Sequence, residues 1–175
     1  LTKVIGSGIG TVTNQFADGN MSAGTVLQVV QTFKDSVFST TSTSYADVTG
    51  LTASITPSSS SNKILVLLRT SQAMSSSDKM YTTLLRGSTA IAVANGKDYF
   101  SHMYPSRNSA DTNTYKAHGS THLDFLDSPS TTSSTTYKVQ MKVNAGTGYL
   151  NRGLDNDEFR GVSSIVLMEI AVWQI

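Results

Sequence analysis

The chain has 175 residues, a net charge of +1 at pH 7 and no cysteine, and 14% of its residues are charged. Because roughly 25% is usual for globular proteins, we expect no field strong enough to attract nucleic acid or an anionic membrane. A disulfide scaffold is excluded, and no apolar run approaches the ~18–20 residues of a membrane-spanning helix. The length fits one domain with a short appendage.

Residues 1–24 differ in composition from the rest of the chain. Glycines recur there, separated by single apolar residues such as Ile5, Ile9 and Phe16. This density is too low for a globular core, and it favours a stem in which copies of the chain meet around an axis. A flexible linker is the alternative. We therefore divide the chain into a stem or connector, 1–24, and a head domain, 25–175.

From residue 25 onward the sequence predicts short strands separated by turns. The expected strands are 26–33, 36–39, 45–48, 51–56, 64–70, 80–86, 89–94, 117–126, 137–143 and 162–175. A turn is expected at Thr49-Gly50, and the strand at 64–70 is apolar enough to be buried on both faces. Without a convincing helix, this pattern predicts an all-β, antiparallel β-sandwich of the jelly-roll kind.

The last strand is apolar on both faces. Ile165, Leu167, Ala171 and Trp173 alternate with a second apolar set, Val166, Met168, Ile170 and Val172. One face can pack into the domain, but the other needs a second sheet or a neighbouring copy. We therefore predict that the second set, together with Ile5, Ile9 and Phe16, lies in the interface of an oligomer. Glu169 interrupts the strand, and we expect it to pair with a Lys or Arg across a strand or subunit.

One predicted strand carries residues that could suggest chemistry. Its alternate positions share a face, and they are His118, Ser120, His122 and Asp124. Successive members are roughly 7 Å apart, too far for a hydrogen-bonded catalytic set, and a metal would need further ligands. A solvated strand face is our interpretation. A metal on the axis of a trimer, bound by His118 or His122 of each copy, is the alternative.

The acidic stretch 155–158 has the composition of a calcium loop. It lacks the spacing and central glycine of an EF-hand, so we interpret it as a solvated loop. No catalytic residue, metal ligand or cofactor is assigned anywhere in the chain.

Residues 95–116 form the least regular segment and are rich in aromatic residues. Candidate binding residues are Tyr99, Phe100, His102, Tyr104, Arg107 and Tyr115. Aromatic rings with Arg on a loop are typical of sugar or protein recognition, and long loops inside compact domains are often functional. The alternative is that these rings anchor the loop onto the sandwich.

Several segments then carry a family likeness in collinear order. They are 24–32 (GTVLQVVQT), 39–51 (STTSTSYADVTGL), 55–59 (ITPSS), 84–91 (LLRGSTAI), 125–129 (FLDSP), 135–140 (TTYKVQ) and 168–170 (MEI). This pattern resembles a head or receptor-binding domain found near the C-termini of bacteriophage tail fibre proteins, those of marine phages especially. The likeness spans nearly all of 24–172 and is weakest at 72–116.

The resemblance implies a non-enzymatic structural protein of the virion, extracellular, homotrimeric and used for host attachment. Its partners would be other virion proteins and a glycan or protein of the host cell surface, contacted through the divergent segment. A capsid decoration or head-fibre protein with a structural role is the alternative. A polysaccharide depolymerase would need a carboxylate pair in a groove, and the low acid content argues against it.

Overall fold

The computed structural model describes residues 22–75, 78–103, 117–153 and 160–172 and contains eleven β-strands within them. Their bounds are β1 Val26–Lys34, β2 Phe38–Thr40, β3 Ala46–Ile55, β4 Lys63–Met74, β5 Met80–Arg86, β6 Thr89–Ile91, β7 Ser101–Met103, β8 Ala117–Asp127, β9 Thr135–Val143, β10 Gly148–Leu150 and β11 Ser163–Ile170. Most of the predicted stem, including Ile5, Ile9 and Phe16, lies outside the described residues, as do Tyr104, Arg107, Tyr115, Trp173 and residues 155–158.

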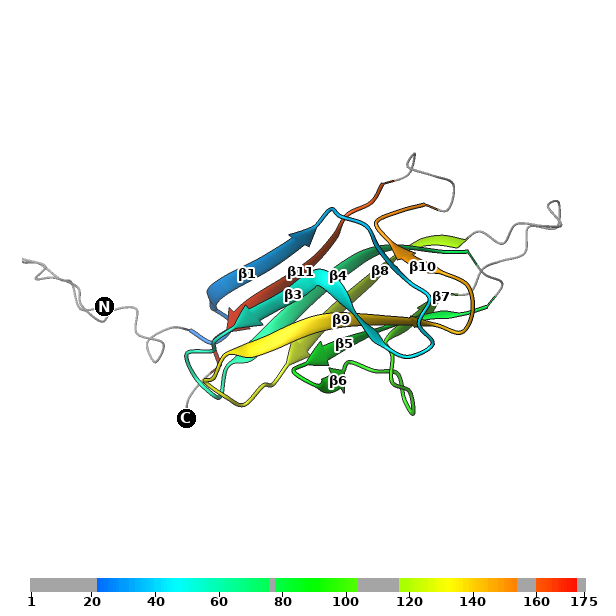
Figure 1. The fold of residues 1–175 in the computed structure, drawn as a ribbon. Helices are drawn as coiled ribbons and strands as arrows, with labels where there is room; N and C mark the ends of the chain where they lie inside the picture. The colour runs from blue at the N-terminus through cyan, green and yellow to red at the C-terminus, as the bar shows by residue number, and fades with distance from the viewer. Residues whose placement is uncertain (1–21, 76–77, 104–116, 154–159, 173–175) are drawn as a thin grey trace, which may run out of the picture.

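The strands form two antiparallel sheets that lie face to face (Figure 1). Sheet A has the order β1-β11-β4-β10-β2, and β8 pairs with the edge of β4 that faces away from β11 and β10. Sheet B has the order β3-β9-β5-β6, with β7 also paired to β5. The predicted fold class, an all-β antiparallel sandwich, is confirmed.

The strand pairs are nested along the chain. The first strand, β1, pairs with the last, β11; β3 pairs with β9; β4 pairs with β8; and β5 pairs with β6 and β7. Partners in the outer pairs are far apart in sequence, so the sandwich resembles one long hairpin that has been rolled up.

The core lies between the sheets and follows the period-two alternation of the strands. On β9 the four residues predicted to point inward, Tyr137, Val139, Met141 and Val143, are fully buried. These β9 residues face Ile64, Val66 and Leu68 of β4 in sheet A, which are also fully buried. The alternation predicted for β11 is confirmed too, with Ile165 and Leu167 in this core.

Four details of the strands differ from the prediction. Residues 46–55 form one strand with a register irregularity rather than two strands around a turn, because Gly50 adopts a φ of 81° inside it. A short β10 follows the 144–147 turn, and β7 lies in the segment predicted to be irregular. On β4, Leu65 and Leu67 are only half-buried, so the prediction of burial on both faces is wrong for the isolated chain.

The two ends of the sandwich are distinct. At one end the described chain starts and finishes, since the Gly24 N–H donates to the Ala171 carbonyl over 2.8 Å. We call this the terminal end. At the opposite, distal end Met80 of β5 lies between Val143 of β9 and Met103 of β7. Figure 1 shows the terminal end at the left and β7 toward the right.

Glu169 has no exposed surface and is the only carboxylate described on β11. It accepts hydrogen bonds from the backbone N–H of Ser58 (2.8 Å), the Ser58 hydroxyl (2.7 Å), the Asn62 amide (2.7 Å) and the Gln28 amide. Among the described residues its partners are therefore neutral donors, and the expected Lys or Arg is not among them. Burial opposes ionisation, but these donors outweigh it and hold the pKa of Glu169 below its ordinary value.

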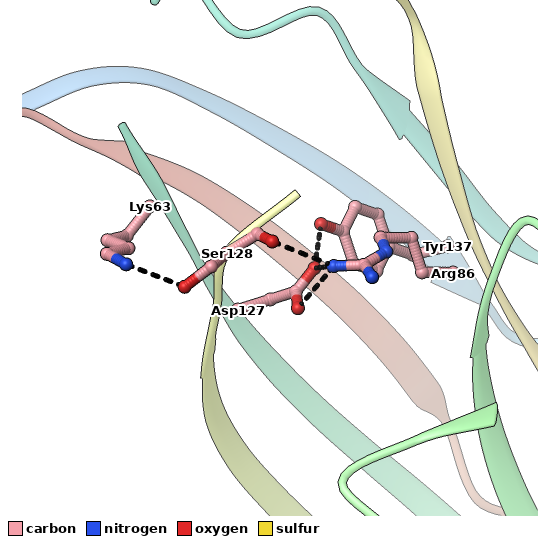
Figure 2. A network of polar contacts seen from close by, with 5 residues as sticks. All are labelled: Lys63, Arg86, Asp127, Ser128 and Tyr137. Atoms are coloured by element: carbon pink, nitrogen blue, oxygen red, sulfur yellow. Dashed lines mark hydrogen bonds and ion pairs between the residues drawn. The ribbon is translucent and has the colours of Figure 1, made fainter. Parts of the chain in front are cut away.

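A second polar network lies between the sheets near the terminal end, and its members Asp127 and Tyr137 are buried (Figure 2). Arg86 of β5 donates to both carboxylate oxygens of Asp127 on β8 (2.8 and 2.9 Å), and the Tyr137 hydroxyl donates to the same carboxylate (2.6 Å). Arg86 also reaches the Ser128 carbonyl, and Lys63 donates to the Ser128 hydroxyl. Burial, followed by the bond to Asp127, raises the pKa of Tyr137. This network joins sheet A to sheet B.

Replacing Glu169 by Gln should destabilise the domain. The amide brings a donor among groups that already donate, so we expect the free energy of unfolding at pH 7 to fall by about 1–3 kcal/mol. Urea denaturation followed by circular dichroism measures this change. Asp35→Asn, an exposed carboxylate, is the control and should leave the midpoint unchanged.

The same variant should alter the acid response of the fold. Because the folded-state pKa of Glu169 is depressed, its contribution is present above its ordinary value of 4.5 and is lost as the pH falls through the folded value. Stability of Glu169→Gln should therefore fall less steeply than that of the wild type below pH 4.5. Parallel stability curves in this range would contradict the role given to Glu169.

Candidate functional site

The outer face of sheet B carries a row of large side chains near the distal end. Tyr81 on β5 lies directly opposite Lys142 on β9 and, on its other side, opposite His102 on β7. Their strand neighbours Met80, Thr82, Met141 and Val143 are buried, so all three side chains point outward. Tyr45, immediately before β3, extends the row beyond Lys142, and Tyr99 precedes β7. We call Tyr45, Tyr81, Tyr99 and His102, with Lys142 and Asp98, the aromatic row.

The rings are in contact with one another. The Tyr81 and Tyr99 ring centroids are 4.9 Å apart and tilted by 52°. His102 lies 5.8 Å from Tyr99, edge to face, and 6.5 Å from Tyr81. These separations fall within the range of favourable aromatic pairs. The rings therefore support one another and hold the 98–103 segment against β5.

Lys142 lies at the centre of the row. Its ammonium lies 4.2 Å from the Tyr45 ring centroid and 5.2 Å from that of Tyr81. The same ammonium is 3.3 Å from a carboxylate oxygen of Asp98. Burial alone would raise the pKa of Asp98, but the bond and charge of Lys142 outweigh it and lower that pKa. The Lys142 ammonium thus contacts the rings of both Tyr45 and Tyr81, and Asp98 stays ionised.

Tyr45 contributes an unusual polar atom. Its hydroxyl oxygen is buried and makes no hydrogen bond of acceptable geometry with the described residues. Burial, followed by the nearby charge of Asp98, raises the pKa of Tyr45, so the phenol stays protonated. The Asp98 carboxylate is therefore close enough to act on the hydroxyl electrostatically, while the geometry of a formed bond is lacking.

Chemically, the aromatic row offers flat ring faces beside an ammonium and a carboxylate. Such a surface can stack on the apolar face of a sugar ring or on a peptide side chain and fix its orientation through polar groups. It contains no nucleophile held by a base. The row lies one residue from the distal end of the strands, away from the end where the described chain enters and leaves.

The candidate binding residues predicted in segment 95–116 fall into two groups in the structure. Tyr99 and His102 belong to the aromatic row, whereas Phe100 packs against the hydrophobic core, as the anchoring alternative predicts. The sequence alone did not indicate Tyr45, Tyr81, Lys142 or Asp98 as members of a site. The strand of Tyr81 gave no signal for its direction, because the sequence Met80-Tyr81-Thr82-Thr83-Leu84-Leu85 does not alternate between apolar and polar residues. The grouping itself depends on cross-strand register, which one sequence does not reveal.

The side chain of His118 lies outside the described part of β8, so the predicted alternative of a metal held by His118 or His122 stays a prediction. Ser120, His122 and Asp124 are exposed on one face of the single chain. Within the described ranges, no three His, Cys, Asp or Glu side chains are grouped closely enough to hold a metal ion. The described part of the chain also contains no helix that could span a membrane.

Comparison of the sequence with models of known protein families and with curated proteins finds no match.

Replacement of Tyr45 and of Tyr137 by Phe should have different effects on stability, because their buried hydroxyls differ in hydrogen bonding. Tyr45→Phe removes a hydroxyl without a formed hydrogen bond, so the free energy of unfolding should stay constant or rise by up to about 1 kcal/mol. Tyr137→Phe removes a donor to the Asp127 carboxylate and should cost about 1.5–3 kcal/mol. Thermal and urea denaturation of the matched pair measure both values. A loss above about 1 kcal/mol in Tyr45→Phe would show that Tyr45 is bonded to Asp98 in solution.

Proposed function

We propose that this chain is the terminal domain of a bacteriophage tail fibre, a non-enzymatic structural protein of the virion that attaches it to a host cell. In this proposal the domain is homotrimeric and extracellular, it contacts other virion proteins, and it binds a glycan or protein of the host surface through the aromatic row. The collinear likeness to phage fibre domains motivates the proposal, and the geometry of the sandwich supports it.

The observation that carries the proposal is the position of the aromatic row. A fibre domain is tethered at one end and must present its contact surface away from the tether. Here the chain enters and leaves at the terminal end, while Tyr81, Tyr99 and His102 lie near the distal end. Rings, a cation and an anion on the strands of sheet B and the segments beside them form a preorganised surface, which lowers the entropic cost of binding.

The strand order supports a fold suited to this role. The nested pairs of β1 with β11, β3 with β9, β4 with β8, and β5 with β6 and β7 are those of a rolled hairpin, and we infer that the sandwich is a jelly roll. Three such domains on one fibre would raise the strength of a weak individual contact through effective concentration.

The acidic residues support a role without catalysis. A glycosidase needs two carboxyl groups facing a bound sugar. Among the described residues, Asp127 is held by Arg86 and Tyr137, Asp47 by Lys138 and Gln140, and Glu169 is buried among neutral donors. Asp98, the carboxylate of the aromatic row, is paired with Lys142.

Binding of the fluorescently labelled full chain to a panel of marine bacterial isolates, measured by flow cytometry, tests the proposal. We expect saturable binding to some isolates. Tyr81→Ala and Tyr99→Ala should each weaken it by about tenfold or more, because removing a central aromatic contact typically costs over 1 kcal/mol. Tyr149→Ala removes a half-buried tyrosine from sheet A instead and should leave binding unchanged.

Two results would count against this assignment. Binding that both row variants retain in full would place the receptor contact elsewhere on the chain. If no isolate is bound while electron microscopy places labelled protein on phage capsids, the decoration role is favoured. Circular dichroism of each variant checks that the sandwich is intact.

A further inference from the structure

The exposed apolar residues of the described chain gather on one surface. Seven large hydrophobic side chains of the described residues are exposed. Five of them lie on β1, on β8 or directly before β11. These five are Val26, Val29, Phe33, Leu126 and Val162, each 47–59% exposed. A scatter of single exposed hydrophobics is normal, whereas a contiguous set on one face marks an interaction site.

The strand register makes this surface contiguous. Val29 of β1 lies opposite Met168 of β11, Met168 lies opposite Leu65 of β4, and Leu65 lies opposite Leu126 of β8. An apolar row therefore crosses all four strands. In the adjacent row Val166 lies opposite Leu67. We call the outward side chains of β1, β11, β4 and β8 the outer face of sheet A.

The outward positions of β3 and β9 in sheet B provide a comparison for the outer face of sheet A. Its outward positions on β3 and β9 carry hydroxyls, amides and charges, including the Ser54–Thr136 hydrogen bond and the contacts of Lys138 and Gln140 with Asp47. The outward side chains of β3 and β9 are thus polar, whereas the row through Val29, Met168, Leu65 and Leu126 on sheet A is apolar. This row has the composition of a surface that is covered.

The size of this face fits the centre of a protein interface. Strands about 4.8 Å apart and about 3.3 Å per residue, taken over four strands and the seven-residue β4–β11 register, give a projected area of roughly 400 Å². This is about half of what one partner contributes to a standard interface, before side-chain relief and the surrounding loops are added.

The charges beside the apolar row indicate what covers it. Arg69 on β4 and Asp124 on β8 both point outward on this face, and neither has an ion-pair partner among the described residues. A nucleic acid or anionic lipid would need one sign of charge. An identical face supplies both signs and an equal apolar row, so Arg69 of one copy can pair with Asp124 of another.

We propose that copies of this chain associate through the outer face of sheet A. The proposal extends the predicted Val166, Met168, Ile170 and Val172 set of β11 to a surface of four strands, and it rests on the proposed function only in taking the fibre to contain several copies. Association through this face leaves the aromatic row on the opposite side of each sandwich, free to bind.

The test is the mass of the full chain in solution, measured by light scattering over a range of concentrations. We expect a multiple of the 18.7 kDa chain mass. Val29→Glu and Leu126→Glu introduce a carboxylate at exposed positions of the face, so the single chain should tolerate them. Because a buried unpaired charge is unfavourable, each should raise the dissociation constant more than about 100-fold and give the monomer mass.

Val93→Glu is the matched control, since Val93 is exposed outside sheet A and its replacement should leave the mass unchanged. A wild-type monomer at high concentration would overturn the proposal and assign the face to another protein or to another part of the chain. An oligomer that persists in both face variants would overturn it as well. A dimer would support the face while contradicting the trimer of the proposed function. Cell binding by the monomeric variants reports on attachment separately.

Discussion

Hydrophobic side chains stand on both faces of sheet A, and sheet B covers only one of those faces. Because strand residues alternate between faces, the inward set of β4 and β11 and the outward set of the same strands cannot be buried by one partner. Ile64, Val66, Ile165 and Leu167 fill the core, while Leu65, Leu67, Val166 and Met168 remain half-exposed. The outward set motivates the association we propose, which leaves the outer face of sheet B, with its aromatic row, as the surface for a ligand.

Buried polar groups fix how the sheets meet. Glu169 joins β1 and the 58–62 turn to β11, and Asp127 joins sheet A to Arg86 and Tyr137 of sheet B. Asn151, fully buried with a φ of 61°, donates to the Lys34 and Ser36 carbonyls and accepts from the Ser163 hydroxyl. A buried polar group without a partner costs free energy. Each network therefore penalises alternative registers of strands that are otherwise similar and apolar.

Periodicity within a strand could be predicted from the sequence, and relations between strands could not. The inward residues of β9 and the two faces of β11 were predicted correctly because alternation is local. The turn expected at Thr49-Gly50 was wrong because the left-handed glycine that suggests a turn also suits an irregularity inside β3. The neutral donors of Glu169 were missed because all of them lie over 100 residues away along the chain.

The same distinction between local pattern and strand register holds for the residues of the candidate site. Tyr99 and His102 could be identified from the composition of their segment, but Tyr45, Tyr81 and Lys142 join them only through the pairing of β5 with β7 and β9. Phe100, adjacent to Tyr99, turns into the core. Composition therefore predicted the right part of the chain, while register selected the members of the aromatic row.

Hydroxyl-radical footprinting of the full chain at high concentration tests the difference between the two outer faces most directly. We expect slow labelling of Val29, Leu65, Leu126 and Met168, and fast labelling of Tyr81, Tyr99 and His102. Dilution should speed labelling of the first group alone. Fast labelling of Met168 and Leu126 at every concentration would contradict the claim that the outer face of sheet A is covered.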